Sequence, residues 1–234
     1  MNGQISIIPI RGIPQISPGD DIASHILASG ETLLDGDVIV VTQKIVSKAE
    51  NRIVKVDPDD PHSHLPYVLE ESRRILRLRG QLLITETRQG FVCANAGVDR
   101  SNLEPDQAAL LPIDSDKSAN TIRSRIEHIL KIRVGVIISD TFGRAWRRGL
   151  TDVAIGCSGI GAILDLKGTR DALGRELQVT EVCIADEVAG AAELVMGKAE
   201  AIPVAIVRGL DPSWLRESSC VDEIIRPPQE DLFR

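Results

Sequence analysis

The sequence predicts an α+β fold of two closely joined subdomains with mixed sheets. Short apolar runs typical of buried strands are interspersed with helical patterns. Strands and helices do not alternate strictly, so a simple doubly wound sheet is the second choice. The 234 residues suit one large domain or two small ones. Aromatic residues make up only 3% of the chain, so the core must be built from isoleucine, valine, leucine and alanine.

Strands are predicted where short apolar runs lie between turn residues. The predicted strands cover residues 4–10, 38–41, 82–84, 91–93, 134–138, 179–184 and 204–207. Arg88, Gln89 and Gly90 should form the turn of a hairpin between the third and the fourth of these. Residues 153–163 are a glycine-rich apolar stretch without an assigned element.

Helices are predicted where a capping residue precedes apolar residues at helical spacing. The expected starts are Asp20 or Asp21, Pro66, Asp116 or Ser118, and Asp186. Gly30 and Gly197 should end the first and the last helix, because glycine readily takes the left-handed conformation found there. The helix from Pro66 should reach Leu76 and pair Glu70 with Arg74 across one turn.

One unit is expected over residues 1–210, with both subdomains inside it, followed by a peripheral tail over residues 211–234. The net charge of −7 and the pI of about 5.2 argue against nonspecific binding to nucleic acid or to anionic membranes. Four cysteines without C-x-x-C spacing favour free buried thiols over a zinc ribbon or a disulfide scaffold. The sequence shows neither a secretion signal nor an apolar run of membrane length, and we expect a cytoplasmic protein.

Four polar segments directly follow apolar strands, where side chains can be held over a cleft. The first, residues 42–50, contains Lys48, which could neutralise a phosphate or be a solvated loop lysine. The second, residues 95–102, places two amides, a carboxylate and a hydroxyl around Gly97. Such oxygen ligands suit Mg²⁺ or Mn²⁺, and an Asx-rich turn is the structural alternative.

The third segment, residues 139–149, favours a functional role. Asp140 and Thr141 stand side by side, which suits a metal that bridges phosphates. Three arginines follow within five residues, and guanidinium groups recognise phosphate and carboxylate in a bidentate manner. These are Arg144, Arg147 and Arg148. A basic surface loop is the alternative, but a local basic cluster is unusual in an acidic chain.

The fourth segment, residues 169–177, could hold substrate carboxylates, although structural ion pairs among its charges are favoured. Several common motifs are missing from the sequence. There is no P-loop, no G-x-S-x-G and no H-E-x-x-H, and residues 156–161 do not form the G-x-G-x-x-G of a dinucleotide-binding loop. Any nucleotide must therefore be bound in another way.

Together these segments resemble the coenzyme F420:L-glutamate ligase family, in which F420 names a deazaflavin coenzyme. The resemblance rests on Gly12-Ile13-Pro14, Val46-Ser47-Lys48-Ala49-Glu50, and residues 95–102, 139–144, 152–156 and 196–209. Each piece alone would be weak evidence. Their common order over nearly the whole chain, from about residue 5 to residue 210, makes chance similarity improbable.

The resemblance implies a GDP-forming ligase that uses GTP to activate the terminal carboxylate of F420-0 as an acyl phosphate. The amino group of L-glutamate would attack this intermediate, giving F420-1 and, in some members, further γ-linked glutamates. The implied cofactors are GTP as co-substrate and two divalent ions per site, Mg²⁺ or Mn²⁺, with K⁺ as a further candidate. An intertwined homodimer with small-molecule substrates is also implied, without nucleic acid or membrane as partners.

The resemblance further assigns roles to single residues. Asp99 and Asp140 would bind one metal and Thr141 the second. Catalytic roles would belong to Asp140, Arg144 and Arg147. The nucleotide would contact Ile13, Pro14, Gln15, Ile16, Gln43, Lys48, Asn102, Met196, Gly197, Lys198, Ala199 and Glu200. Lys198 departs from members that carry an acidic ligand of the second metal at this place, a role that Glu200 or water could take.

Two other functions share these features. A related metal-dependent amide ligase with a different acceptor would carry the same four segments. A non-catalytic nucleotide-binding relative is less consistent with the sequence, because a lapsed enzyme has no physical need for clustered metal ligands. The acceptor that supports GTP turnover would identify the first alternative, and metal-dependent nucleotide turnover would separate an active ligase from the second.

Overall fold

The computed structural model describes residues 3–231, whose centre is a five-stranded sheet in the order β1–β12–β2–β8–β9. These strands are β1 (Ser6–Ile10), β12 (Val204–Arg208), β2 (Val38–Thr42), β8 (Gly135–Arg144) and β9 (Arg147–Ser158). Strands β2 and β8 are parallel, and all other neighbours are antiparallel. A mixed sheet with helices on it confirms the predicted α+β class.

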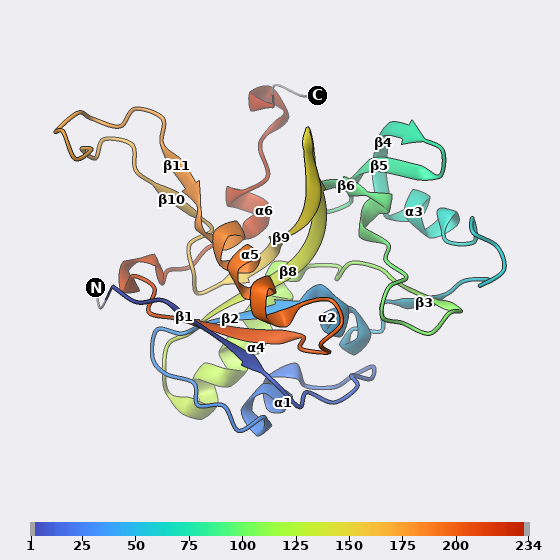
Figure 1. Cartoon of the computed structure of the whole chain (residues 1–234), viewed down its shortest axis with the longest axis horizontal. Helices are drawn as coiled ribbons and strands as arrows, with labels where there is room; N and C mark the ends of the chain where they lie inside the picture. The colour runs from blue at the N-terminus through green and yellow to red at the C-terminus, as the bar shows by residue number, and fades with distance from the viewer. Residues whose placement is uncertain (1–2, 232–234) are drawn as a thin grey trace.

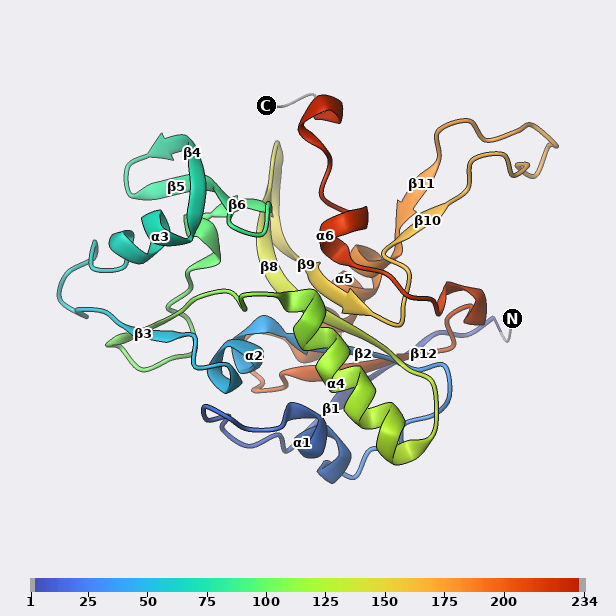
Figure 2. The same cartoon turned by 180° about the vertical axis from the view of Figure 1, so that it is seen from behind.

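Helices cover both faces of this sheet. Helix α5 (Ile184–Met196) packs on one face against β1, β9 and β12, and helix α4 (Ser115–Leu130) packs on the other against β8 and β9. Accordingly α5 lies in front of the sheet in Figure 1, and α4 lies in front in Figure 2. Helix α1 (Ile22–Ala28) packs beside α4, and α2 (Gln43–Ala49) continues directly from β2. Because both faces are covered, Val38 to Val41 are all 0% exposed.

A smaller unit lies to one side of the main sheet and has its own hydrophobic cluster (Figure 1). It contains α3 (Leu65–Glu71), the sheet of β4 (Ser72–Arg79), β5 (Leu82–Thr87) and β6 (Val92–Ala94), the turn η1 (Asn95–Gly97), and the pair β3 (Ile53–Lys55) and β7 (Gln107–Ala109). The buried residues of its hydrophobic cluster are Val56, Val68, Leu83, Ala96, Val98, Ala108 and Leu110. Two hydrophobic clusters are compatible with two subdomains, whose boundary stays a prediction.

The helix predicted from Pro66 is shorter than expected, and this prediction was wrong beyond Glu71. Residues Ser72–Arg79 form β4, which pairs with β5. Arg74 therefore donates from Nε to Glu86 Oε2 across the hairpin at 2.8 Å, instead of pairing with Glu70. The strand is stabilised by pairing with the next strand of the hairpin, which helical spacing within the segment itself cannot reveal.

The segment of residues 139–149 also differs from its prediction as a polar segment after a strand. Strand β8 continues through it to Arg144, and β9 returns from Arg147 through most of the unassigned stretch that follows. Asp140 and Thr141 consequently lie inside a strand. The resulting hairpin rises well beyond the rest of the sheet (Figure 2).

Helix α4 begins earlier than predicted. Its N-cap is Asp114, which accepts the N–H of Lys117 at 2.9 Å, rather than Asp116 or Ser118. Asp116 instead accepts the N–H groups of Cys157 and Cys220 at 2.7 and 2.8 Å. The tail over residues 211–234 is thus packed in part against the rest of the protein, since Cys220 begins α6 (Cys220–Glu223) and is fully buried.

The pair β10 (Ile163–Asp165) and β11 (Glu181–Cys183) carries a projecting loop, at the upper left of Figure 1. This loop contains the fourth polar segment. Asp171 accepts the backbone N–H groups of Leu173 and Arg175, each at 2.8 Å. Within residues 3–231 no ion pair joins the charges of residues 169–177, so the structural ion pairs favoured from the sequence are not formed. No helix in this range is long and apolar enough to cross a bilayer.

Candidate functional site

One end of four neighbouring strands of the main sheet lies at a common edge. Ile10, Val204, Val41 and Ile138 are successive register partners across β1, β12, β2 and β8. This is the carboxyl edge of the parallel pair β2–β8, where open sheets usually bind ligands. Strand β2 stops one residue later, at Thr42, while β8 continues. The chain segments that leave the other strands here enclose a pocket against the extended part of β8.

The pocket has a volume of about 860 Å³. Most residues predicted to bind metal or nucleotide line it. They are Ile13, Pro14, Gln15, Ile16, Gln43, Lys48, Asp99, Asn102, Asp140, Thr141, Met196, Gly197, Lys198 and Ala199. Glu200, Arg144 and Arg147 do not line it. The fold therefore brings together side chains that are up to 186 positions apart in the sequence, while their individual roles stay predictions.

Asp140 and Thr141 point to opposite faces of β8, because successive side chains in a strand alternate. Thr141 lies opposite Asp152 of β9, and its hydroxyl donates to Asp152 Oδ1 at 2.6 Å. Asp140 lies on the other face, close enough to Asp99 and Cys93 of the smaller unit to interact with them electrostatically. One strand thus contributes to two separate groups of charged side chains.

The first group, which we call the Asp99–Asp140 group, also contains Lys44 and Ser101. Lys44 Nζ donates to Asp99 Oδ2 at 2.6 Å and to the Ser101 carbonyl at 2.6 Å. Asp99 Oδ1 accepts the Ser101 N–H at 2.7 Å. Burial alone would raise the pKa of Asp99, but these donors outweigh it and lower that pKa. Asp99 is therefore ionised at neutral pH.

Asp140 is the uncompensated member of this group. Burial raises the pKa of Asp140 to about 7, and the charges of Asp99 and Asp152 add to the rise. The N–H of Thr141, which donates to this carboxylate, and the charge of Lys44 oppose the shift only in part. Among the described residues, no lysine or arginine forms an ion pair with it. Two carboxylates and a hydroxyl, with one carboxylate unbalanced, fit a hard divalent cation such as Mg²⁺ or Mn²⁺.

A strained turn fixes Asp99 in place. Asn95, Ala96 and Gly97 have consecutive positive φ angles of 49°, 52° and 73°. A side chain on Gly97 would meet Leu111 at 2.6 Å, so only glycine fits at this point of the turn. Asp99 then exchanges two backbone hydrogen bonds with Ala109, at 3.0 and 2.8 Å. The turn that the sequence predicted around Gly97 thus delivers a carboxylate to the pocket.

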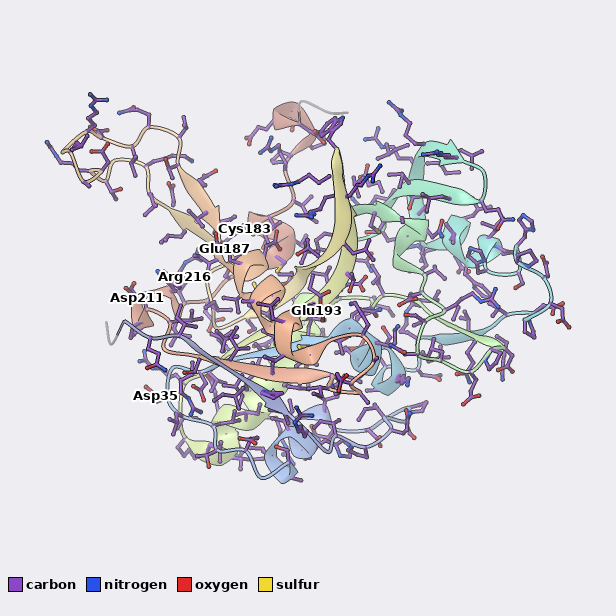
Figure 3. The ribbon with its side chains drawn as sticks, viewed as in Figure 1. Asp35, Cys183, Glu187, Glu193, Asp211 and Arg216 are labelled. Carbon is purple, nitrogen blue, oxygen red and sulfur yellow. The ribbon has the colours of Figure 1, made fainter. Side chains whose placement is uncertain are left out.

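The second group, which we call the Lys198 group, contains Thr141, Asp152, Glu193 and Lys198. Lys198 Nζ lies 3.3 Å from Asp152 Oδ1 and 3.2 Å from Glu193 Oε1, and it donates to the Thr141 hydroxyl. Glu193 stands at the C-terminal end of α5 (Figure 3). Burial and the charge of Asp152 raise the pKa of Glu193. Burial would lower the pKa of Lys198, but the two carboxylates raise it, so the ammonium is charged.

The predicted nucleotide residues form the rest of the wall. Lys48 Nζ donates to Gln15 Oε1 at 3.2 Å, and its pKa is lowered by burial and by the nearby Lys44. Asn102 Nδ2 donates to the Lys198 carbonyl at 3.2 Å and so joins two walls of the pocket. Gln43 is only 1% exposed, and its side-chain oxygen accepts the Ser47 hydroxyl at 2.8 Å.

The arginine cluster lies at the exposed tip of the β8–β9 hairpin. Arg144 Nη2 donates to the Arg148 carbonyl at 3.2 Å, and the side chains of Arg147 and Arg148 are exposed. Phe142 and Leu150, just below the tip, line the pocket. The arginines therefore stand above the rim of the pocket and outside its wall.

Four members of the two groups were given no individual role from the sequence: Lys44, Ser101, Asp152 and Glu193. Two of them carried a signal. Asp152 directly precedes the apolar stretch of β9 and is itself buried, which is costly for a carboxylate unless it is paired. Glu193 lies in the last turn of α5, where the helix dipole disfavours a negative charge. Ser101 is the hydroxyl of the second polar segment and Lys44 lies in the first, but the ion pair between Lys44 and Asp99 joins two separate segments and could not be predicted.

Comparison with known proteins shows the family to which the chain belongs. Residues 11–209 match the family described as F420-0:Gamma-glutamyl ligase. The Coenzyme F420:L-glutamate ligase of Methanothermobacter thermautotrophicus is 42% identical, over 98% of this chain and 99% of that protein. The proteins of the same name from Methanopyrus kandleri and Archaeoglobus fulgidus are each 40% identical, over 99% of this chain and 100% and 97% of those proteins.

Proposed function

The chain belongs to the F420-0:gamma-glutamyl ligase family, and on that premise we propose that it joins L-glutamate to F420-0 with GTP and a divalent cation. The observation that carries this proposal is the Asp99–Asp140 group at the carboxyl edge of the main sheet. It combines an uncompensated carboxylate with a pocket large enough for a nucleotide and a second substrate.

The first step is an attack of the F420-0 carboxylate on the γ-phosphate of GTP. The attack brings two anions together, and positive charge must offset their repulsion. Asp99 and Asp140 would hold the divalent cation, which would neutralise charge on the phosphates. Lys48 lies on the wall with a lowered pKa and could bind a phosphate oxygen. This step gives an acyl phosphate and GDP.

The second step is an attack of the glutamate amino group on the acyl phosphate. A carbon–nitrogen bond forms, the bond to the phosphate oxygen breaks, and inorganic phosphate leaves. An acyl phosphate also reacts readily with water, so the pocket must be shielded. The hydrogen bond between Asn102 and the Lys198 carbonyl holds two walls together and would limit access from that side.

A homodimer is part of the proposal. The loop between β10 and β11 exposes the apolar side chains of Leu173 and Val179. Apolar side chains on a projecting loop are typical of a surface that a partner covers. Sedimentation equilibrium of the purified chain would test this, and a monomer at micromolar concentration would contradict it.

The ligase proposal is tested by the mass of the product. Purified protein would be mixed with GTP, Mn²⁺, L-glutamate and F420-0. We expect a gain of one or more glutamyl units, no gain when GTP or Mn²⁺ is left out, and loss of the reaction in Asp99→Asn.

Asp106→Asn is the matched control for this assay, because Asp106 pairs with Lys55 on the surface outside the pocket. It should react normally. A protein that turns over GTP with Mn²⁺ but adds no glutamate to F420-0 would contradict the proposal and indicate a different acceptor.

A further inference from the structure

We propose that the ammonium group of Lys198 takes the place of a second divalent cation, so that each pocket of this protein holds one divalent cation and one fixed lysine. This inference rests on the proposed function for the presence of a cation on the Asp99–Asp140 group. It concerns the neighbouring Lys198 group on the opposite face of β8.

The Lys198 group resembles a metal site in which the ammonium of Lys198 occupies the position of the metal ion. Three oxygen atoms from three elements converge on Lys198 Nζ: the Thr141 hydroxyl of β8, Asp152 Oδ1 of β9 and Glu193 Oε1 of α5. An ammonium group has three N–H donors, so each can be directed at one of these oxygens. No donor is left over, and both carboxylates have a positive partner.

A second divalent cation would have to compete for the same oxygens. It could bind Thr141, Asp152 and Glu193 only if Lys198 Nζ moved away, since two positive charges cannot share that position. Displacement would also break ion pairs that are already formed. Asp152 is only 4% exposed, so its pairing with Lys198 is poorly screened by water.

The Asp99–Asp140 group differs in this respect. Lys44 Nζ also donates to three oxygens, Asp99 Oδ2, the Ser101 carbonyl and the Ser101 hydroxyl, but it forms no ion pair with Asp140 in the part of the chain described. The Lys198 ammonium, in contrast, contacts both carboxylates of its group. The cation therefore belongs with Asp140, and the lysine already compensates Asp152 and Glu193.

The backbone holds Lys198 where its side chain can reach these oxygens. Gly197, with φ at 58°, ends α5 and turns the chain toward the pocket. Asn102 then binds the Lys198 carbonyl from the other side. The Lys198 side chain itself is 59% exposed, so the three oxygens rather than packing fix the position of Nζ. Truncating this side chain should leave no cavity in the core.

The experiment counts bound Mn²⁺ by electron paramagnetic resonance in the presence of a non-hydrolysable GTP analogue. We expect one Mn²⁺ per chain in the unaltered protein and two in Lys198→Ala. The double variant Lys198→Ala with Asp152→Asn should return to one, because the opened group then lacks a carboxylate. Lys55→Ala removes an exposed lysine outside the pocket and should stay at one.

Two Mn²⁺ or none in the unaltered protein would overturn the inference, as would a count of one in Lys198→Ala. Melting temperatures of the variants show that each is folded. The count does not depend on ligation, so it separates the two proposals. A protein that binds one Mn²⁺ but forms no product would contradict the proposed function and leave this inference standing.

Discussion

Two groups of carboxylates lie beside opposite faces of β8, and their negative charges are balanced to different degrees. In the Lys198 group, both Asp152 and Glu193 contact an ammonium. In the Asp99–Asp140 group, Asp99 is paired with Lys44 while burial leaves Asp140 with a pKa of about 7. Keeping Asp140 ionised in the metal-free protein costs roughly 4 kcal/mol. The comparison teaches that a ligand site is marked by the charge that the protein leaves unbalanced.

The largest effect is expected from Asp140→Asn. Ligation should fall by at least about 10³-fold, because the carboxylate that completes the cation site is gone. The metal-free protein should be as stable as before or more so, since an unfavourable buried charge is removed and the side-chain oxygen can still accept the Thr141 N–H. Product formation and Mn²⁺ binding measure the first effect, and thermal unfolding in a chelator measures the second. Retained Mn²⁺ binding would contradict the claim that Asp140 completes the cation site, and with it the difference between the two groups.

Asp152→Ala should affect stability in the opposite direction. It leaves the buried Ser139 hydroxyl and the Thr141 hydroxyl without their acceptor, and it weakens the position of Lys198. We expect a loss of about 2–4 kcal/mol in the free energy of unfolding, measured by urea denaturation without metal. If this variant were as stable as Asp140→Asn, the two groups would not differ in the way described.

The pH dependence of stability sharpens the comparison further. The pKa of Asp140 is about 7 when folded and near the ordinary 3.8 when unfolded, so between these values the folded state binds more protons. Stability from this group is present below about pH 4 and is lost as the pH rises through 7. The metal-free protein should therefore lose stability relative to Asp140→Asn by a few kcal/mol over this range. Parallel stability curves for the two proteins would contradict this account.

The smallest effect is expected at the tip of the β8–β9 hairpin, which lies beyond both groups. Arg147→Ala should raise the KM for F420-0 several-fold and leave the KM for GTP unchanged, because the exposed guanidinium suits an anionic substrate at the rim. Steady-state kinetics with each substrate varied in turn would measure this. Arg79→Ala, a change on the exposed β4–β5 hairpin, is the control, and an equal rise there would exclude a specific role of the tip.

Much of the fold could be predicted from local patterns. The buried strand at residues 38–41, the hairpin around Gly90 and the end of α5 at Gly197 were all confirmed, because each depends on neighbours in the sequence. The failures share one cause. Strand β4 and the long extension of β8 each pair with the strand that follows directly in a hairpin, and neither the helical spacing nor the polar residues within the segment show that pairing.

In the pocket, too, single segments could be identified from the sequence but the contacts between them could not. Asp99, Asp140 and Lys198 were identified from segments that resemble the family, and the structure brings them to one pocket. The pairing of Lys198 with Asp152 and Glu193 could not be predicted, because it joins α5, β9 and the following loop in space. The contrast between the two groups is therefore a property of the tertiary structure.

The most direct test of the account is a crystal structure with Mn²⁺ and GDP in which the metal is located by anomalous scattering. The account predicts one anomalous peak per chain, bound by Asp99 and Asp140, with Lys198 Nζ still among the oxygens of Thr141, Asp152 and Glu193. A second peak in the position of Lys198 Nζ, with the lysine displaced, would contradict it.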